Sequence, residues 1–528
     1  MKPDRWRYWL VETGQDDSVE ALLRGITRGV DVEFVGDRGL KRWGKNLRLS
    51  DPTHEDKISA VIAADVAAGK KAGPFDEPPC PNFVVSPIGA VPKKFSEKIR
   101  VIHHLSFPFH GASINADTVD QYLPLSSFDV AADAVRRLGP GCFLIKLDVE
   151  AAYKQVPVRQ EDWHLLGFMW KGKYYYERVL PFGLKSSCRL WDQYADAIRR
   201  MLKRLFDIDV VIHYIDDFLF VCKELSKAQS ALKNAVALCK DLGIPWADNK
   251  TEGPVTCLTF LGIELDTIAM EARLPEAKLK ELQALAKVWA EKAACTGAEL
   301  QSLVGTLAFA CKVVRPGRFY LRRIIAHMAL VLRITKSRTK QVFSLPSEVR
   351  EDVRWWLKWI AHWNGVSLLY ELEWTSAVKL NLTTDACLTG FGAMCGTKWF
   401  AGRWTASQLA LAKRTDRESM PYLELHALVS AALTFGSAWT GLKVLFLCDC
   451  KPVVQAIAKQ ASPQPAMMHL LRLLCDAACR FGFDFKCDHI DGVSNTAADI
   501  LSRAGDCKEF RGLFPGAEQR PTPPHLPP

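Results

Sequence analysis

The chain has 528 residues, of which 48% are hydrophobic and 24% charged, so it is long enough for several domains and too apolar for a disordered protein. No uninterrupted apolar run reaches the roughly 18 residues that a membrane span needs, and the first residues lack the apolar core of a signal peptide. We therefore expect an intracellular protein of the cytoplasm or nucleus, not secreted and without a membrane partner.

The sixteen cysteines are spread without Cys-x-x-Cys pairs, which favours reduced, largely buried thiols over a disulfide framework. One cluster offers side chains that zinc binds: Cys475, Cys479, Cys487 and His489. Its spacing fits no common zinc finger, so we predict no zinc site there.

The net charge of +10 is unevenly placed. Residues 273–340 contain fourteen Lys or Arg and four Glu, so the rest of the chain is close to neutral. Such a concentration is typical of a groove for a polyanion, although a solvated basic helix face gives the same pattern.

In chain order, residues 1–50 have mixed charge and few clear periods, and we predict an N-terminal arm. Apolar residues recur at helical spacing between Pro52 and Lys71, and two short strands surround a basic turn within Phe83–Ile102. A solvated hairpin tip is the alternative interpretation of that turn.

Strands and helices alternate from Phe143 to Asp266. We expect a strand ending at Asp148, a hairpin from about His164 to Val179, a helix from about Ser186 to Phe206, a hairpin over Val210–Val221 and a helix from about Ser226 to Leu242. This order predicts an antiparallel sheet backed by helices.

Carboxylates stand at the ends of two of these strands. Asp216 and Asp217 lie between two apolar runs, and Asp148 ends an earlier one. A polar turn is the simpler interpretation of an isolated Asp-Asp pair. If the strand with Asp148 lies beside the hairpin, three mutually repelling carboxylates converge, enough to hold two divalent ions for phosphoryl transfer.

After Pro275 the sequence becomes helical and basic, with apolar faces over Leu279–Trp289 and Leu300–Leu307. Four tryptophans at helical spacing are more typical of packing than of base stacking: Trp355, Trp356, Trp359 and Trp363. From Lys379 the pattern predicts three strands, a helix, a strand, two helices, a strand and a helix, which carry Asp385, Glu424, Asp449 and Asp499.

Four stretches, in this order, resemble the successive motifs of retroelement reverse transcriptases: Asp148-Val-Glu-Ala-Ala-Tyr153, Leu180-Pro-Phe-Gly-Leu-Lys-Ser-Ser187, Tyr214-Ile-Asp-Asp217 and Phe260-Leu-Gly262. Three more look most like the tyrosine-recombinase retrotransposons of the DIRS and Ngaro type: His103-His-Leu-Ser-Phe-Pro108, Trp163-His-Leu-Leu-Gly167 and Val314-Arg-Pro-Gly317. The element order after Lys379 resembles the ribonuclease H fold.

The resemblance implies an α+β, multi-domain chain with a right-hand polymerase fold of fingers, palm and thumb, followed by a ribonuclease H-like α/β domain. The domains we predict are an N-terminal arm (1–50), fingers and palm (51–270), a basic helical thumb (271–342), a connection (343–378), the ribonuclease H-like domain (379–504) and a Pro-rich, flexible tail (505–528).

The same resemblance implies an RNA-directed DNA polymerase of a retrotransposon, which transfers nucleotides from dNTPs to a primer 3′-hydroxyl and cleaves the RNA strand of RNA–DNA hybrids. Its expected partners are an RNA template, a DNA primer, the RNA–DNA hybrid and dNTPs. Its expected cofactor is Mg²⁺, two ions per active site, for which Mn²⁺ can substitute.

The resemblance also assigns catalytic residues. The polymerase metal site would consist of Asp148, Val149, Asp216 and Asp217. The ribonuclease metal site would consist of Asp385, Glu424, Asp449 and Asp499, with His489 assisting product release.

Other residues would bind the nucleotide. Lys93 and Arg100 would contact its triphosphate, although Lys94 adjoins Lys93. Tyr153 would exclude a 2′-hydroxyl, unless it is a packed core tyrosine. Phe182 and Gly183 would lie against the nucleotide, and Lys250 would donate a proton to pyrophosphate, unless it is a surface lysine.

The nucleic acid would be held by two further groups of residues. Leu261 and Gly262 would press on the primer end, and the thumb would face the duplex backbone with Lys312, Arg315, Arg318, Arg322 and Arg323.

The chain departs from the family at two points. Ser187-Cys188-Arg189 stands where relatives commonly have a small residue, Ala and Pro, and Asp385-Ala-Cys387 stands where Asp-Ala-Ser is more usual. Both changes lie beside metal ligands, so they bear on fidelity or rate more than on reaction class. A decayed or co-opted copy that binds nucleic acid without catalysis is the alternative, but seven retained acids that repel one another favour an active enzyme.

Overall fold

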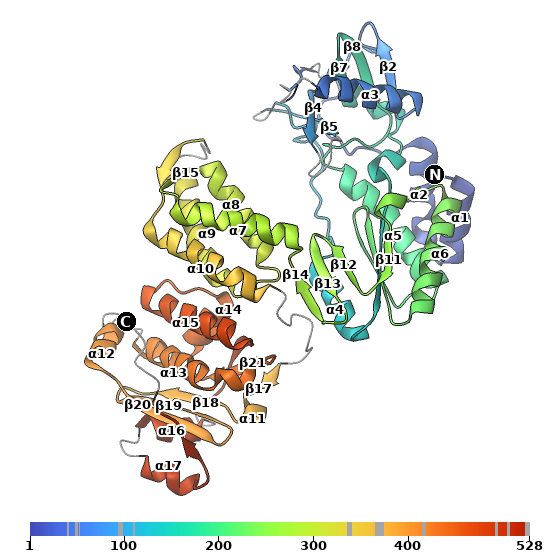
Figure 1. The fold of residues 1–528 in the computed structure, drawn as a ribbon. Helices are drawn as coiled ribbons and strands as arrows, with labels where there is room; N and C mark the ends of the chain where they lie inside the picture. Colours follow the sequence, from blue (N-terminus) through green and yellow to red (C-terminus); the bar gives the residue numbers. More distant parts are fainter. Residues whose placement is uncertain are drawn as a thin grey trace. The chain divides into compact units, whose positions relative to one another are not determined.

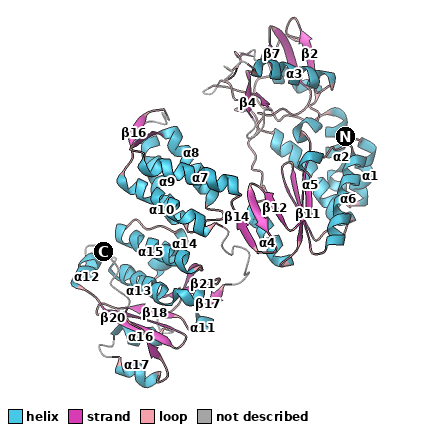
Figure 2. Ribbon diagram, viewed as in Figure 1, coloured by secondary structure: helices cyan, strands magenta, loops and turns pink. Residues whose placement is uncertain are grey.

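The computed structural model describes residues 1–39, 42–47, 51, 53–92, 99–108, 111–334, 340–364, 374–413, 419–491, 495–503 and 507–522. The chain divides between Phe260 and Leu261 into two compact units. Figure 1 labels their helices and strands, and Figure 2 shows that each unit combines helices with sheets. Among the described residues, no helix is both long and apolar enough to cross a membrane.

A four-stranded antiparallel sheet lies at the centre of the first unit, in the order β11-β6-β10-β9. Its strands are β6 (Phe143–Asp148), β9 (Val210–Tyr214), β10 (Asp217–Cys222) and β11 (Glu252–Val255). Strand β10 is buried from Phe218 to Cys222, because helices α4 (Phe128–Leu138) and α6 (Leu225–Leu242) pack against it. The predicted strand ending at Asp148 and the predicted hairpin are confirmed.

Helix α5 (Ser187–Leu205) packs beside β9 and supplies much of the core. Its buried residues recur at helical spacing, among them Trp191, Ile198 and Leu202. Helices α5 and α6 confirm the two helices predicted in this region.

Two helices precede this core, α1 (Pro3–Glu12) and α2 (Asp16–Arg28), so the prediction of an N-terminal arm is wrong for this stretch. Trp6 and Leu10 are fully buried in one core with residues of α5, α6 and the sheet. The Trp6 indole N–H donates to the carbonyl of Leu242 (3.1 Å), at the end of α6. The stretch belongs to the first unit because its apolar residues complete that core.

A second sheet in this unit has the order β1-β3-β7-β8-β2, and β4 pairs with β5 in a separate hairpin. These strands are β1 (Arg42–Trp43), β2 (Lys71–Phe75), β3 (Val84–Val85), β4 (Ile88–Pro92), β5 (Ile99–His103), β7 (Gly167–Trp170) and β8 (Lys173–Glu177). Strands β7 and β8 confirm the predicted hairpin, whose turn residues Lys171 and Gly172 have positive φ (48° and 76°). Helix α3 (His54–Ala67) packs against β2 and β5, as the helical pattern there predicted.

The remaining short elements of the first unit are β12 (Cys257–Phe260) and three 3-10 helices, η1 (Ala152–Gln155), η2 (Gln160–Leu166) and η3 (Asp248–Lys250). Along the chain, η1 follows β6, η2 precedes β7 and η3 precedes β11.

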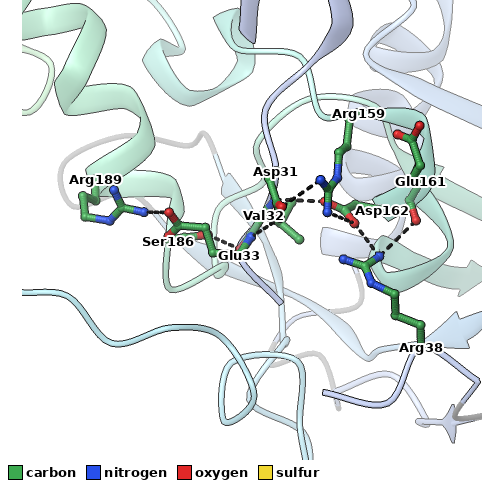
Figure 3. A network of polar contacts seen from close by, with 9 residues as sticks. All are labelled: Asp31, Val32, Glu33, Arg38, Arg159, Glu161, Asp162, Ser186 and Arg189. Atoms are coloured by element: carbon green, nitrogen blue, oxygen red, sulfur yellow. Dashed lines mark hydrogen bonds and ion pairs between the residues drawn. The ribbon is translucent and has the colours of Figure 1, made fainter. Parts of the chain in front are cut away.

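A buried carboxylate ties the segment after α2 to η2 (Figure 3). Asp162 is fully buried and accepts hydrogen bonds from the Val32 N–H (3.0 Å), from Arg38 (2.6 Å) and from Arg159 (2.9 Å). Two guanidinium groups and a backbone N–H thus compensate for the loss of water around this charge.

The same segment contacts the start of α5 (Figure 3). The Ser186 hydroxyl donates to the carbonyl of Val32 (2.8 Å), and Arg189 forms an ion pair with Glu33. Arg189 is one of the departures from the family motif, and this ion pair gives it a structural partner.

In the second unit, β13 (Ile263–Asp266) and β14 (Glu271–Arg273) form a hairpin before a group of helices. The helices are α7 (Glu276–Glu291), α8 (Gly297–Ala310), α9 (Gly317–Ile334) and α10 (Ser347–Trp363), with β15 (Ala294–Thr296) and β16 (Val342–Ser344) paired between them. Helix α10 packs against α7 and α9, so the predicted connection of 343–378 is wrong up to the end of this helix, which belongs with the predicted thumb.

The tryptophans of α10 support this assignment. Trp356 is fully buried, and Trp355 stacks on Tyr320 of α9 with ring centroids 4.1 Å apart. The prediction that they serve packing is confirmed for these two; the side chain of Trp363 lies outside the described residues.

The C-terminal part of the second unit has the predicted order of strands and helices, with one additional helix, α12 (Ala406–Lys413), before the predicted helix that carries Glu424. Its strands are β17 (Thr375–Ser376), β18 (Thr383–Ala386), β19 (Gly390–Cys395), β20 (Lys398–Arg403), β21 (Lys443–Cys448) and β22 (Asp484–His489). Its helices are α11 (Ala377–Leu380), α12 (Ala406–Lys413), α13 (Ser419–Phe435), η4 (Gly436–Trp439), α14 (Lys451–Lys459), α15 (Pro465–Phe481) and α16 (Thr496–Arg503). Strands β18, β19 and β20 are antiparallel, β21 and β22 are parallel, and both α13 and α16 pack against β18 and β19.

The predicted Pro-rich tail begins too early. Helix α17 (Lys508–Leu513) follows α16, and β23 (Glu518–Gln519) pairs with β20. Phe510 is fully buried against Trp399, with ring centroids 5.0 Å apart, so apolar contacts extend this domain past residue 504. The last residues, 523–528, lie outside the described part of the chain.

Replacement of Asp162 tests the role of the buried carboxylate. We expect Asp162→Asn to lower the free energy of unfolding by about 3–5 kcal/mol, because Arg38 and Arg159 lose a buried counter-charge. Chemical denaturation of the full chain measures the change. The matched control is Asp133→Asn, which removes a half-exposed partner of Arg136 and should cost less than about 1 kcal/mol. Equal losses in the two variants would contradict this account.

Candidate functional sites

The first candidate site lies where β6 and β10 end side by side. The strand register places Asp148 opposite Asp217, and neighbouring strands hold such Cα pairs roughly 4.5–5.5 Å apart. Asp216 occupies the turn between β9 and β10, and its carbonyl accepts from the Val149 N–H (2.9 Å). Strand pairing thus brings the three predicted carboxylates together.

The electrostatics of this site disfavour three charged carboxylates without a cation. Burial and the neighbouring Asp148 carboxylate raise the pKa of Asp216. Burial, Asp216 and Asp148 raise the pKa of Asp217 to about 6. Carboxylate oxygens gathered in this way form the ligand set that Mg²⁺ prefers, so the residues present fit a divalent metal.

Lys250 contacts this carboxylate group directly. Its ammonium group lies 2.7 Å from both carboxylate oxygens of Asp148, and its side chain remains half exposed. Lys250, predicted to lie near a triphosphate, therefore lies at the edge of the carboxylates.

A cavity of about 780 Å³ opens next to these acids. Four of the predicted nucleotide-binding residues line it: Arg100, Tyr153, Phe182 and Lys250. The Arg100 guanidinium lies over the Phe182 ring (5.1 Å), and the Phe182 ring contacts Tyr153 (5.2 Å between centroids).

Gly183 follows Phe182 and approaches the chain of β5 closely. Its φ is +111°, and a Cβ atom there would lie 2.1 Å from the carbonyl oxygen of His103, so only glycine fits. Lys93, the other predicted triphosphate ligand, lies outside the described residues, as does Lys94.

The predicted primer contact is a tight turn in the second unit. Leu261 and Gly262 both have positive φ, 48° and 77°. The Lys278 ammonium group donates to the carbonyl of Gly262 (3.1 Å). The turn is thus braced by helix α7, which is consistent with a fixed backbone at this point.

The predicted basic face of the thumb is only partly available to a duplex. Arg323 makes two hydrogen bonds to the buried Asp352 (2.6 and 2.9 Å), Arg315 pairs with Asp484 (3.2 Å), and Arg322 donates to the carbonyl of Lys459 (3.0 Å). For Arg323 the ion pair competes with the predicted duplex contact, because its guanidinium neutralises a buried carboxylate. Of the five residues, Lys312, Arg318 and Arg322 are exposed.

The second candidate site lies in the C-terminal α/β part. Asp385 lies in β18, Glu424 lies on α13, Asp449 directly follows β21, and Asp499 lies on α16. Asp385 and Glu424 are buried; Asp449, Asp499 and Arg503 act electrostatically on Asp385, and Cys448, Asp385 and Asp449 act on Glu424. The four predicted acids therefore converge, from four different elements.

Burial dominates the electrostatics of this site. Burial and the Asp449 and Asp499 carboxylates raise the pKa of Asp385 to about 6, although the Ser502 hydroxyl opposes this shift by donating to Asp385 (2.6 Å). Burial and neighbouring acidic groups, among them Asp385 and Asp449, raise the pKa of Glu424 to about 10. A divalent cation would relieve this repulsion, so the oxygen ligands fit one.

The sequence prediction missed two residues of this site. Ser502 holds Asp385, and the sulfur of Cys448 lies within 4.8 Å of ligand atoms of both Glu424 and Asp449. Cys448 directly precedes Asp449, and Ser502 is three residues after Asp499, so proximity in sequence was the available signal. The departure Cys387 contacts the same region, because its thiol donates to the carbonyl of Ser502 (3.1 Å).

His489 is exposed at the end of β22, opposite Cys448 in the strand pairing. The cysteines weighed as a zinc cluster separate into two pairs in the structure. Burial and the neighbouring Cys479 thiol on α15 raise the pKa of Cys475, and the Cys487 thiol raises that of Cys448. None of the sixteen cysteines, all of which lie in the described part of the chain, forms a disulfide.

Comparison with known proteins finds a family match that contains the first site. Residues 91–265 match the model of the family described as reverse transcriptase (RNA-dependent DNA polymerase), and all three acids of the first site lie in this range. This part of the chain is similar to that family.

Two viral polyproteins are similar to this chain, one over most of it and the other over about a third. Polyprotein P3 of Commelina yellow mottle virus is 21% identical over 378 residues, which cover 70% of this chain and 18% of the relative. The Gag-Pro-Pol polyprotein of Human T-cell leukemia virus 3 (strain Pyl43) is 32% identical over 166 residues, which cover 31% of this chain and 10% of the relative. The matched regions thus span less than a fifth of either relative.

A solved structure shows the fold. The foamy viral protease-reverse transcriptase in complex with double-stranded DNA aligns with a TM-score of 0.51 and 14% identity, over 92% of this chain and 82% of that one. The chain therefore has the multi-domain α+β architecture of a reverse transcriptase, as the sequence predicted.

The raised pKa of Glu424 makes the stability of the metal-free protein depend on pH. The folded-state pKa (about 10) is raised above the unfolded value (4.5), so metal-free protein loses stability as the pH rises from 4.5 towards 10. We expect Glu424→Gln to be about 1–3 kcal/mol more stable than wild type at pH 8 with a chelator, and equal to it at pH 4. Chemical denaturation at both pH values measures the difference.

Mn²⁺ should reverse the order at pH 8, because it stabilises the ionised wild-type site more than the variant. The control is Glu518→Gln, an exposed acid of the same unit, which should follow the wild type throughout. The same pH dependence in wild type and Glu424→Gln would contradict the assigned repulsion.

Proposed function

We propose that this chain is an RNA-directed DNA polymerase that also cleaves the RNA strand of RNA–DNA hybrids. The observation that carries the proposal is the pairing of Asp148 with Asp217, beside Asp216, inside a domain that matches the reverse transcriptase family. The reaction is attack of a primer 3′-hydroxyl on the α-phosphate of a dNTP, with release of pyrophosphate.

In the polymerase site, Asp148, Asp216, Asp217 and Val149 would hold two Mg²⁺ ions. The bound metal would supply charge stabilisation for the attacking and leaving oxygens. The chain's own residues would orient the nucleotide. Arg100 and Lys93 would contact the triphosphate, Phe182 and Gly183 would lie against the nucleotide, and Tyr153 would lie beside the sugar.

Lys250 would act at the end of the reaction. Its position 2.7 Å from Asp148 supports a role at the edge of the metal site, from which its ammonium group can reach the leaving pyrophosphate and give it a proton.

In the second site, Asp385, Glu424, Asp449 and Asp499 would hold Mg²⁺ for attack of water on an RNA phosphodiester. The burial of Asp385 and Glu424 next to one another supports this, since a purely structural fold gains nothing from buried acids that repel. His489, exposed at the rim, would assist release of the product.

The finer assignments belong to the same proposal. The element is a retrotransposon of the DIRS or Ngaro type, with an RNA template, a DNA primer and dNTPs as partners and an intracellular location. The domain division is fingers and palm, a helical thumb that includes α10, and a ribonuclease H-like domain that includes α17. The alternative is a decayed copy that binds nucleic acid without catalysis, and the convergence of the acids favours an active enzyme.

Primer extension on an RNA template with Mg²⁺ tests the polymerase site. We expect Asp216→Asn to lower kcat by roughly 100-fold or more, the scale of losing one group that stabilises transition-state charge. The control is Asp129→Asn, an exposed acid of α4, which should extend primers at the wild-type rate. Equal extension by wild type and Asp216→Asn, or none by either, would remove the polymerase from the proposal.

Cleavage of a labelled RNA–DNA hybrid tests the second site separately. We expect Asp449→Asn to lose cleavage by a similar factor, roughly 100-fold, and to retain primer extension, because the two sites lie in different units. Asp488→Asn, an exposed acid on β22, is the matched control. Cleavage unaffected by Asp449→Asn would take the ribonuclease out of the proposal.

A further inference from the structure

Helix α9 packs against helix α15 of the C-terminal α/β part, although basic residues of α9 were predicted to face a duplex. Phe319 of α9 is buried, and its ring stacks on the ring of Phe485 on β22, with centroids 5.9 Å apart. The Cys475 thiol of α15 donates to the carbonyl of Pro316, directly before α9 (3.3 Å). The helical group α7–α10 and the α/β part, both within the second compact unit, therefore share buried contacts.

A buried carboxylate joins these two parts. Asp352 on α10 is 1% exposed and pairs with two guanidinium groups, that of Arg323 on α9 (2.6 Å) and that of Arg472 on α15 (3.0 Å). The Arg472 guanidinium also lies over the ring of Tyr320 on α9 (5.4 Å). Because Asp352 and Arg472 are largely removed from water, their pairing depends on correct geometry. Separation of the two parts would deprive Arg472 of this counter-charge, whereas Asp352 would keep Arg323.

A second carboxylate makes the connection from the opposite side. Asp476 on α15 accepts hydrogen bonds at its Oδ1 atom from the Trp355 indole N–H (2.7 Å) and from the Tyr320 hydroxyl (3.2 Å). Both donor side chains are buried, and their stacked rings, 4.1 Å apart, hold each other in place. The helical group thus presents two oriented donors to α15.

Together these contacts form what we call the α9–α15 interface. Its residues are Phe319, Tyr320, Arg323, Asp352 and Trp355 of the helical group, and Arg472, Cys475, Asp476 and Phe485 of the α/β part. Domains of one chain move relative to one another unless their interface prevents it. Directional hydrogen bonds at two carboxylates favour one orientation of α9 on α15 and resist sliding. The α/β part, with its four acids, is thereby fixed relative to the helical group.

We propose that the α9–α15 interface fixes the second acid site relative to the predicted thumb, and that Arg472 and Asp476 are positioning residues that bring an RNA–DNA hybrid held by the thumb to that site. This inference rests on the proposed function, because the hybrid is a substrate of that function. Lys312 and Arg318 are exposed on the helical group and can face the hybrid backbone. A rigid link between two binding surfaces raises the effective concentration of the hybrid at the second surface.

Three variants of the full chain test the inference. Arg472→Met removes the ion pair across the interface and leaves Asp352 with Arg323. Asp476→Leu removes the acceptor of two hydrogen bonds, whereas Asp476→Asn keeps an oxygen that accepts from both donors. The matched control is Lys398→Met, which removes an exposed cation on β20 of the same part. The quantities measured are kcat and KM for cleavage of RNA–DNA hybrids of increasing length.

We expect the wild-type KM to fall as the hybrid becomes long enough to reach the thumb, with kcat unchanged. In Arg472→Met and Asp476→Leu the KM for the longest hybrid should rise about three- to tenfold, the range that one hydrogen bond represents. The kcat values and the KM for the shortest hybrid should stay at the wild-type values, because the acids are untouched. Asp476→Asn should recover most of the loss, and Lys398→Met should match the wild type. A damaged fold would instead lower kcat on every hybrid and would not be rescued by asparagine.

Two measurements decide the inference without catalysis. Fluorescence anisotropy of the same hybrids gives dissociation constants, which should follow the changes in KM. Hydrogen exchange, followed by mass spectrometry, tests the interface from both sides. Tyr320→Phe should speed exchange of the α15 amides and Arg472→Met that of the α10 amides, each about three- to tenfold, because each variant loosens the opposite part. Lys398→Met should change neither.

The outcomes separate the inference from the proposed function. No cleavage by wild type, together with a dissociation constant for the longest hybrid that rises in Arg472→Met and Asp476→Leu, would remove the ribonuclease and keep both residues as positioning residues. A wild-type KM and dissociation constant that do not depend on hybrid length would overturn the inference. So would wild-type values for the longest hybrid in both variants, or amide exchange that ignores changes on the opposite side of the interface.

Discussion

Repulsion between carboxylates, imposed by backbone pairing, is the constraint on which the rest of this structure depends. Strands β6 and β10 are locked in register by buried side chains such as Leu147 and Phe218, and that register places Asp148 opposite Asp217. A slip of one strand by one residue would turn its acid to the opposite face of the sheet, away from the other acid. The strand core therefore stabilises an arrangement that its own charges oppose, and a bound cation is the natural counterpart of the stored repulsion. In the second unit, two strands and two helices bring acids that repel one another together in the same way.

Much of this arrangement could be predicted from the sequence, because its signals are local. Apolar runs that end in an acid predicted Asp148, Asp216 and Asp217 as site residues. The order of elements after Lys379 did the same for the four later acids. The helix over Ser187–Leu205 was also predictable, since its apolar residues recur with one period. The rest depended on partners distant in sequence. Nothing near Arg323 indicates that its charge belongs to the buried Asp352, and only the fold brings them together.

Two errors of prediction have different physical causes. The helices before residue 29 do have apolar residues at helical spacing, such as Trp6 and Leu10, but frequent charges between them hide the pattern. The prolines near the C-terminus led to the prediction of a flexible tail. In the structure Phe510 is buried, and the chain after it pairs with β20. The sulfur of Cys448 lies beside the acids although strand alternation alone would direct neighbouring residues 448 and 449 to opposite faces, so sequence proximity to Asp449 was its one signal. The chain leaves the strand after Cys448, and this change of direction brings both side chains together.

The contacts of Asp162 and Trp6 bear on how this protein can be dissected. The family match begins at residue 91, yet Arg38 and the Val32 N–H neutralise a carboxylate deep inside the matched region, and Trp6 covers the end of α6. A fragment cut at residue 91 would keep Arg159 beside Asp162 but lose the two donors from Val32 and Arg38, and it would expose the apolar surface that Trp6 covers. The family match therefore covers less than the first compact unit, whose core includes residues of α1.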